Sequence, residues 1–226
     1  MPTALITGSS KGLGKFLALE FAKAGYNLII HGRNAQLLDN VKQDILRNNV
    51  KCDVIIGEIT STKTIDDLYN PAKEKGLDIL VNNVGAYSTG SFQEMDIKEF
   101  EKSIDINLLA PARLMHKMYE LLKKSSGLII NINSIAGKNP NMKEAAYCAG
   151  KHGLRGLTTS LTNEANNDGI RMIDYYLGAM NTDMTRGRPD QEKFMDPKEV
   201  AKIIYRNSKE DPSVRTNEIT LARRKY

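Results

Sequence analysis

The stretch Ala4-Leu5-Ile6-Thr7-Gly8-Ser9-Ser10-Lys11-Gly12-Leu13-Gly14 decides the fold, because it joins an apolar run to a glycine-rich turn and then to a helical pattern. Glycines let the backbone turn tightly and approach a pyrophosphate closely. The N-terminus of a helix presents free N–H groups and a positive dipole end to such an anion. A turn directly after a first strand and directly before a helix therefore predicts a dinucleotide-binding loop, with a plain tight turn as the alternative.

Along the rest of the chain, short apolar runs alternate with amphipathic stretches. The runs are continuous rather than alternating in polarity, which implies a sheet covered on both faces. This order predicts an α/β fold: one Rossmann-type, doubly wound parallel β-sheet flanked by helices on both faces, in a single domain over residues 1–226. The strand-like runs are Ala4–Ile6, Leu28–Ile30, Val54–Ile56, Ile79–Val81, Leu128–Ile130, Met172-Ile173 with Tyr175-Tyr176, and Ile219–Leu221.

Capping patterns mark the ends of several expected helices. Asp96 stands three residues before Glu99, and Asp196 is followed by Pro197, as at helix N-termini. Gly25 follows Leu13–Ala24 as an expected C-terminal stop.

Composition and charge exclude several classes of protein. With 41% hydrophobic and 26% charged residues, disordered and fibrous classes are not expected. The net charge of +5 is scattered, and its densest run, Arg223-Arg224-Lys225, is interpreted as a solvated tail, so no nucleic-acid partner is expected. Cys52 and Cys148 lack metal spacing, and no metal is expected. No apolar stretch has membrane-spanning length and no leader pattern precedes the first strand, so the expected location is the cytoplasm, without membrane attachment.

The end of the second strand indicates which dinucleotide would bind. NAD-dependent folds usually place an acid there for the ribose diol, but Leu28–His31 runs into Gly32-Arg33-Asn34. Arg33 suits bidentate binding of a phosphate, and Lys11 supplies a second cation near the same place. NADP(H) is therefore favoured over NAD(H), with a solvated turn residue as the alternative reading of Arg33.

The spacing G-x-x-x-G-x-G, with Thr7 in front, resembles the cofactor loop of the short-chain dehydrogenase/reductase family, in its classical branch. The resemblance implies that the loop contacts the cofactor through Gly8, Ser10, Lys11, Gly12, Leu13 and Gly14. It also implies cofactor contacts from Glu58 and Ile59, although the family commonly has Asp where Glu58 stands. Asn82-Asn83-Val84-Gly85 is similar to the family's N-N-A-G element, so Asn83 and Gly85 are expected to line the cofactor.

Tyr147 and Lys151 stand four residues apart in a helical stretch that begins near Ala145, so their side chains share one helix face. A phenol with a pKa of about 10 is a poor acid/base at neutral pH. A nearby ammonium should lower that pKa into a working range. The spacing alone is common on helix surfaces.

Further residues strengthen this interpretation. Ser134 ends the strand that begins at Leu128, at the edge where ligands bind in open α/β sheets. Through the resemblance, Asn107 is expected in a helical stretch, where it holds a water that links Lys151 to solvent. The family pattern P-G-x-I/V-x-T corresponds to Leu177–Thr182, with cofactor contacts expected from Gly178, Met180 and Thr182.

The resemblance covers essentially the whole chain and implies an NADP(H)-dependent oxidoreductase that interconverts a carbonyl compound and its alcohol by hydride transfer. Tyr147 would act as the acid/base, Ser134 would hold the carbonyl oxygen, and Lys151 would bind the nicotinamide ribose; Asn107 completes the catalytic set. Two alternatives stay open: a non-catalytic, dinucleotide-sensing regulator, and a structural protein on the same fold.

The substrate-binding pocket is expected to be open, because only Asp183–Met195 separates Thr182 from the next helix. A solvent-exposed turn is the alternative for Asp183–Pro189. The resemblance implies a homodimer or homotetramer, with the helices around Asn107 and Tyr147 between subunits. The residues expected to border the pocket are Ala86, Tyr87, Ile135, Met142, Ala179 and Met180.

Overall fold

The computed structural model describes residues 1–211 and 213–223; position 212 and positions 224–226, which include most of the basic tail, lie outside the described residues. Seven strands form one parallel sheet in the order β3-β2-β1-β4-β5-β6-β7. All the expected strand-like runs lie in strands, and the α/β prediction is confirmed. The strands are β1 (Thr3–Ile6), β2 (Asn27–Gly32), β3 (Cys52–Ile56), β4 (Ile79–Asn82), β5 (Leu128–Ser134), β6 (Arg171–Leu177) and β7 (Glu218–Leu221).

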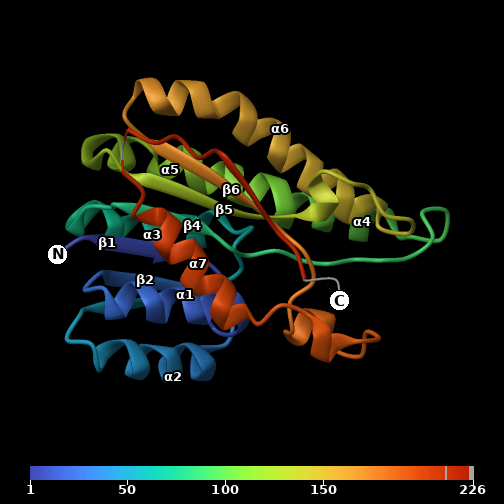
Figure 1. Ribbon diagram of the computed structural model, residues 1–226, viewed down its shortest axis with the longest axis horizontal. Coiled ribbons are helices and arrows are strands. Elements are labelled where there is room, and N and C mark those ends of the chain that lie inside the picture. The colour runs from blue at the N-terminus through green and yellow to red at the C-terminus, as the bar shows by residue number, and fades with distance from the viewer. Residues whose placement is uncertain (212, 224–226) are drawn as a thin grey trace.

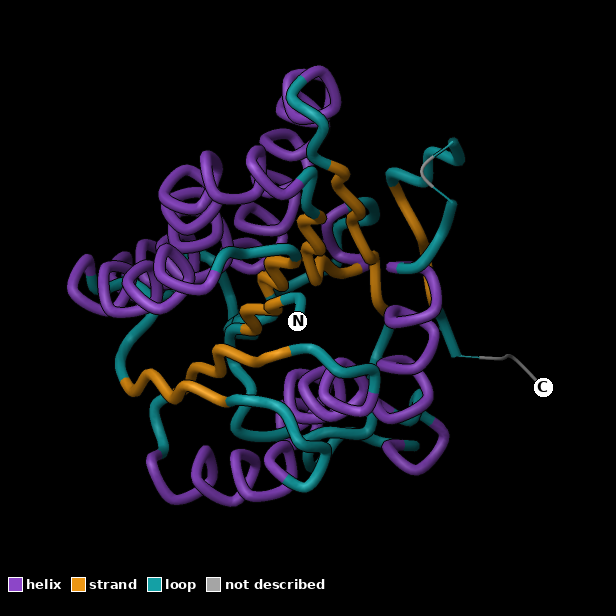
Figure 2. The backbone as a smooth tube through the Cα atoms, turned by 90° about the vertical axis from the view of Figure 1, so that its left-hand side faces the viewer, coloured by secondary structure: helices purple, strands orange, loops and turns teal. Residues whose placement is uncertain are grey.

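Helices cover both faces of the sheet, and Figure 2 shows the strands between two helical layers. The first layer contains α1 (Gly12–Lys23), α2 (Ala35–Leu46) and α7 (Pro197–Ser208). The second contains α3 (Thr62–Lys75), α5 (Ala110–Ser125) and α6 (Ala145–Asn167), with α4 (Ile97–Ile104) packed on α6. In the described part of the chain, no helix is long and apolar enough to cross a membrane.

The strands are apolar at successive positions because both faces of the sheet are buried. On β1, Ala4 and Ile6 pack into the core beneath α1, α2 and α7, whereas Leu5 packs into the core beneath α3 and α5. On β5, Ile129 and Ile130 divide between the two cores in the same way. Neighbouring strand residues point to opposite faces, so a sheet between two helical layers requires apolar residues at both.

The predicted capping residues begin and end helices as expected. Asp96 Oδ1 accepts a hydrogen bond from the Lys98 N–H at 2.9 Å, and Asp196 Oδ1 accepts one from the Lys198 N–H at 2.8 Å. Gly25 follows α1 with a φ of +83°, the left-handed conformation in which glycine commonly ends a helix.

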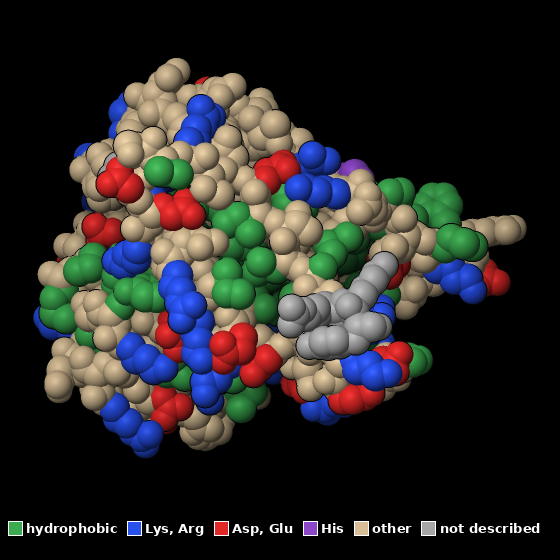
Figure 3. All heavy atoms as spheres, viewed as in Figure 1, with side chains coloured by type: hydrophobic (Ala, Val, Ile, Leu, Met, Phe, Trp, Pro, Cys, Tyr) green, Lys and Arg blue, Asp and Glu red, His purple; other side chains and the backbone are tan. Residues whose placement is uncertain are grey.

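The sheet creates a crevice between β1 and β4, where the strand order reverses direction. In Figure 1 the carboxyl ends of the strands lie on the right-hand side, and the segments after β4 and after β6 extend beyond them. Ligands in open α/β sheets bind at such a reversal, outside the carboxyl ends of the strands. On the face drawn in Figure 3, Lys and Arg side chains are interspersed with Asp and Glu.

Candidate active site

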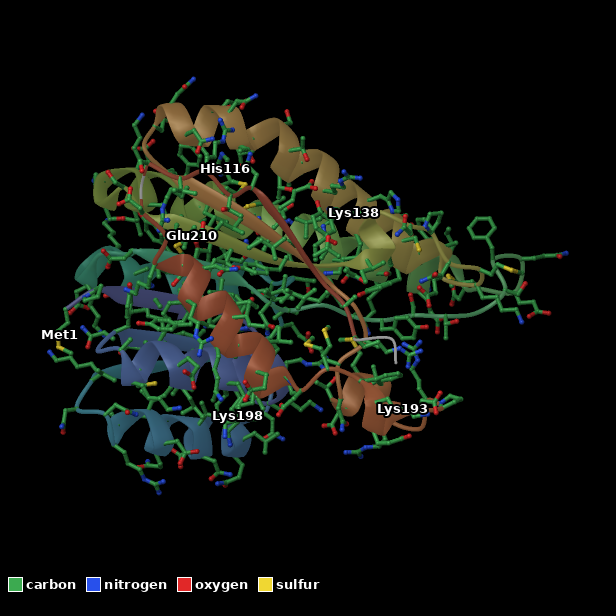
Figure 4. The ribbon with its side chains drawn as sticks, in the orientation of Figure 1. Met1, His116, Lys138, Lys193, Lys198 and Glu210 are labelled. Carbon is green, nitrogen blue, oxygen red and sulfur yellow. The ribbon has the colours of Figure 1, made fainter. Side chains whose placement is uncertain are left out.

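A cleft of about 730 Å³ lies at the carboxyl edge of the sheet, within the size range of small-molecule sites. It brings together the glycine loop, the ends of β2, β4 and β5, the start of α6 and the segment after β6. Figure 4 labels Lys193 on that last segment, which projects from the carboxyl edge of the sheet. All but one of the sequence-predicted site residues line the cleft: Gly8, Ser10, Lys11, Gly12, Leu13, Gly14, Arg33, Glu58, Ile59, Asn83, Gly85, Ser134, Tyr147, Lys151, Gly178, Met180 and Thr182.

The glycine loop is shaped by close backbone contacts. A Cβ added at Gly14 would lie 2.2 Å from the Gly8 carbonyl oxygen, and one added at Gly8 would lie 2.9 Å from Asn83 Nδ2. Among the described residues, no side chain caps the first turn of α1, whose N-cap is Lys11. The first-turn N–H groups are therefore available to an anion in the cleft.

Asn83 and Thr7 tie the glycine loop to the end of β4. Asn83 Nδ2 donates to the carbonyl oxygens of Thr7 at 2.8 Å and Gly8 at 3.2 Å. Thr7 Oγ1 accepts from the backbone N–H groups of Asn83 and Val84 at 3.0 and 3.2 Å. This fixes the two walls of the crevice relative to each other.

His31 also holds the loop, and the sequence reasoning missed it. Its Nδ1 lies 3.5 Å from the backbone nitrogen of Gly8, a donor, and its Nε2 lies 3.1 Å from the Gly57 carbonyl oxygen. The donor at Gly8 makes Nδ1 the acceptor, so the proton is assigned to Nε2. Burial lowers the pKa of His31, which favours this neutral form. The sequence signal that could have identified His31 is its position as a polar residue directly after the apolar run Leu28–Ile30.

The two cations expected at the adenine end have different partners. Arg33 Nη1 lies 3.4 Å from Glu58 Oε1, on the rim of the cleft. Lys11 Nζ instead pairs with Asp183 Oδ2 at 2.8 Å, across the cleft on the segment after β6. Lys11 and Arg33 both line the cleft, but an acid 172 residues away in the chain attracts the Lys11 ammonium.

Ser134, Tyr147 and Lys151 converge where β5 ends and α6 begins. Tyr147 is 9% exposed and Lys151 is 4% exposed. Lys151 Nζ donates to the Ile132 carbonyl oxygen at 2.9 Å and lies 5.9 Å from the centre of the Tyr147 ring. Ser134 Oγ accepts from the Ala136 N–H at 3.1 Å, which fixes its side chain at the strand end.

Burial changes the pKa values of Tyr147 and Lys151 in opposite directions. It raises the pKa of Tyr147, and the Ser134 hydroxyl opposes the rise by hydrogen bonding. It lowers the pKa of Lys151 from 10.5 to about 8, and the charge of Asp174 opposes the fall. The pKa of Tyr147 is therefore raised overall in this structure, whereas the sequence predicted a lowered one. The reason is that desolvation dominates at both groups and Lys151 donates to the backbone instead.

Asn107 lies outside the lining of the cleft but adjoins its wall. It stands in a π-helical turn, Asp105–Leu109, between α4 and α5, where an ordinary helical stretch was expected. Asn107 Oδ1 accepts from the Ala86 N–H at 3.2 Å, and Nδ2 donates to the Ala86 carbonyl oxygen at 2.9 Å. Single π-helical turns occur frequently at functional sites. Here the turn fixes Ala86, which lines the cleft.

The segment after β6 closes one side of the cleft. Thr182 caps a short 3-10 turn, Asp183–Thr185, and its methyl group would lie 3.6 Å from a Cβ added at Gly12. Thr185 Oγ1 donates to the Met180 carbonyl oxygen at 2.6 Å. Asp183 and Thr185 both line the cleft, so this part of the segment is more than a solvent-exposed turn.

Of the residues expected to border the substrate pocket, five line the cleft: Ala86, Tyr87, Ile135, Ala179 and Met180. The prediction that Met142 borders the pocket is wrong, because this residue is 90% exposed and lies outside the lining, in the turn that precedes α6. Two lining residues that the sequence reasoning missed are Glu144 and Arg188. A charged residue in a short loop gives no sequence signal that it faces inward.

Comparisons with known proteins agree with this geometry. Residues 2–193 match the model of the family described as short chain dehydrogenase. An uncharacterized oxidoreductase of Staphylococcus epidermidis is 27% identical over 96% of this chain and 95% of its own length. A metagenomic short-chain oxidoreductase solved with NADP is 25% identical, covers 100% of this chain and 98% of its own, and has a TM-score of 0.86.

An alcohol dehydrogenase from the archaeon Thermococcus sibiricus, solved with 5-hydroxy-NADP, shares the fold with a TM-score of 0.91 at 24% identity, covering 100% of both chains. The chain belongs to the classical short-chain dehydrogenase/reductase family. It is an oxidoreductase of that family, as the sequence resemblance predicted.

Proposed function

We propose that this chain is an NADP(H)-dependent oxidoreductase that interconverts a carbonyl compound and the corresponding alcohol, with Tyr147 as the acid/base. The observation that carries the proposal is the convergence of Ser134, Tyr147 and Lys151 in the cleft that the glycine loop also lines. Enzymes of this kind need a proton donor and a hydride donor at one carbonyl group.

The cleft fits a dinucleotide on several grounds. The uncapped first turn of α1 offers N–H groups to a pyrophosphate. Gly8 and Gly14 carry no side chain, so a ligand can approach the backbone of the loop closely at both positions. In this proposal the loop holds the pyrophosphate, Glu58 and Ile59 adjoin the adenine, and Thr182 adjoins the nicotinamide. A bound nicotinamide dinucleotide supplies the hydride to the carbonyl carbon, or accepts it from the alcohol in the reverse direction.

Two observations support NADP(H) over NAD(H). Strand β2 ends at Gly32 and is followed by Arg33 and not by an acid, and Arg33 lines the cleft beside Glu58. A relative 25% identical to this chain was solved with NADP. A guanidinium suits a 2′-phosphate because it can donate two parallel hydrogen bonds.

The chain's own groups would handle the proton. Tyr147 donates its hydroxyl proton to the carbonyl oxygen during reduction, and Ser134 donates a second hydrogen bond that holds this oxygen in place. Lys151, whose pKa of about 8 leaves it mostly protonated at pH 7, stabilises the phenolate that Tyr147 becomes. Asn107 acts through Ala86 and the neighbouring wall, as a positioning residue.

The test is NADPH oxidation by the purified chain across a panel of aldehydes, ketones and quinones, with Tyr147→Phe as the variant. The expected result is turnover of at least one compound, lost by at least 100-fold in Tyr147→Phe, the scale of general acid–base catalysis. Tight NADPH binding without Tyr147-dependent turnover of any compound would favour the dinucleotide-sensing regulator instead.

A further inference from the structure

Arg188 lies in the segment after β6 and lines the same cleft as Ser134 and Tyr147. Its guanidinium carbon lies 6.0 Å from the centre of the Tyr87 ring and 5.5 Å from the centre of the Phe194 ring. The Tyr87 ring packs edge-on against Tyr147, with the ring centres 5.3 Å apart. Tyr87 is therefore an aromatic neighbour of both a guanidinium and the proposed acid/base.

The charge of Arg188 is uncompensated in the part of the chain that the structure describes, where it has no ion-pair partner. Two acids of the same segment are paired with other cations: Asp183 with Lys11 and Arg186, and Asp190 with Lys193. A second guanidinium, that of Arg223, lies 5.8 Å from the centre of the Phe194 ring. Phe194 and Arg223 are not among the residues that line the cleft, so Arg188 is the group of the three that offers a positive charge to an anion there.

Glu144 places a negative charge in the cleft at the hydroxyl of Tyr87. Its carboxylate accepts hydrogen bonds from the Tyr87 hydroxyl at 2.7 Å and from Asn141 Nδ2 at 2.9 Å. Its charge also helps to raise the pKa of Tyr147, so it acts at the reacting end. An anion beside the Glu144 carboxylate would be repelled, whereas an anion beside the Arg188 guanidinium would be attracted.

We propose that Arg188 determines specificity, and that the substrate is a carbonyl compound with an anionic group, a carboxylate or a phosphate, about one aromatic ring away from its carbonyl. This inference rests on the proposed function. The guanidinium can donate two parallel hydrogen bonds to such a group, and its exposed position leaves these donors accessible.

The test compares 4-formylbenzoate with its uncharged methyl ester as substrates, at saturating NADPH. The measured quantity is the ratio of kcat/KM for the two compounds. The expected ratio exceeds tenfold in the unmodified chain and falls by about 10- to 100-fold in Arg188→Gln, the scale of a charged hydrogen bond. Arg188→Lys should retain part of the preference, because it keeps the charge and loses the bidentate geometry.

Arg186→Gln is the matched control, since Arg186 lies two residues away and is not among the residues that line the cleft. It should leave the ratio unchanged. Binding gives a second readout: 4-(hydroxymethyl)benzoate titrated calorimetrically into the chain saturated with NADPH forms a complex that cannot react. Its Kd should rise by about 10- to 100-fold in Arg188→Gln and stay constant in Arg186→Gln.

Four outcomes would overturn the inference. Tyr147-dependent turnover of both aldehydes with no charge preference would refute it and leave the proposed function intact. A preference equally reduced in Arg186→Gln would assign the effect to the general charge of the segment. A raised Kd for NADPH in Arg188→Gln, with an unchanged substrate ratio, would assign Arg188 to the cofactor. Absence of Tyr147-dependent turnover would refute the proposed function as well.

Discussion

At the scale of single residues, Tyr147 and Lys151 share a face of α6, and burial favours the neutral form of both. The Lys151 ammonium is held by one backbone carbonyl oxygen, that of Ile132. An ammonium removed from water with so few partners is expensive to keep charged. The proposed catalytic group thus lowers the stability of the unliganded fold.

Replacing Lys151 by Met should stabilise the unliganded chain at pH 7 while it abolishes the proposed turnover. The Lys151 pKa is 10.5 in unfolded chains and about 8 in the fold. Between these pH values the unfolded state binds more protons, so the stability of the unmodified chain rises with pH across this range.

The increase in the free energy of unfolding caused by Lys151→Met at pH 7 should be on the order of 3 kcal/mol at most, and this increase should shrink as the pH approaches 10. Urea unfolding of both proteins at pH 7 and pH 10 measures this difference. A gain that stays constant with pH would show that Lys151 is not the titrating group.

Arg33→Ser should raise the Kd for NADPH by roughly 10- to 100-fold, the scale of a lost charged hydrogen bond, and should change the Kd for NADH little. Cofactor fluorescence titrations measure both values. Arg47→Ser is the control, because Arg47 is an exposed arginine paired with Asp44, and it is absent from the cleft lining. Equal affinity of the unmodified chain for the two cofactors would contradict the role given to Arg33.

At the scale of elements, the loop between β1 and α1 depends on backbone contacts that leave no room for side chains. Gly14 lies on the first turn of α1 and would carry its Cβ into the Gly8 carbonyl oxygen. The glycine is needed for this approach of the two backbone segments and not for its φ. Any larger residue must move the loop that is proposed to bind the pyrophosphate.

Gly14→Ala should therefore weaken NADPH binding by tenfold or more and lower stability by about 1–3 kcal/mol, the usual cost of overpacking. Gly156→Ala is the matched control, since an added Cβ on that turn of α6 meets nothing within 4 Å. It should be neutral or stabilise by about 0.5–1 kcal/mol. Calorimetric titration and thermal unfolding measure the two effects. Normal NADPH binding by Gly14→Ala would contradict the proposed loop function.

Sequence alone predicted the elements well because their signals are local. Continuous apolar runs such as Leu28–Ile30, and caps such as Asp96, depend only on neighbours along the chain. It could not predict the partners of Lys11 or Arg188, because both depend on a segment far away in the chain. Nor could it predict that burial would outweigh the attraction between Lys151 and Tyr147.

At the scale of the whole molecule, a second hollow lies away from the cleft, on the outer layer of helices. It is lined by side chains of α3, α5 and α6, among them Ile65, Met115, Leu157 and Leu161. Tyr119 and His116 also border it, and Figure 4 labels His116 among the side chains of this layer. Apolar surface of this kind supports the proposed pairing of helices between subunits.

We expect a homodimer or homotetramer in solution, and light scattering after size exclusion measures its mass. Leu161→Glu should shift the assembly toward the monomer, because it introduces a charge into an apolar contact. Val214→Glu, an exposed apolar position outside both hollows, is the control. A monomeric unmodified chain at micromolar concentration would contradict this prediction.

The central claim, hydride transfer with Tyr147 as the acid/base, is tested most directly by isotopic labelling. The chain is incubated with a reactive carbonyl compound and NADPH that carries deuterium at the transferred position of C4, and the alcohol is analysed by mass spectrometry. We predict one deuterium on the carbinol carbon, formed at least 100-fold more slowly by Tyr147→Phe. An alcohol without deuterium, or equal rates for the two proteins, would contradict the claim.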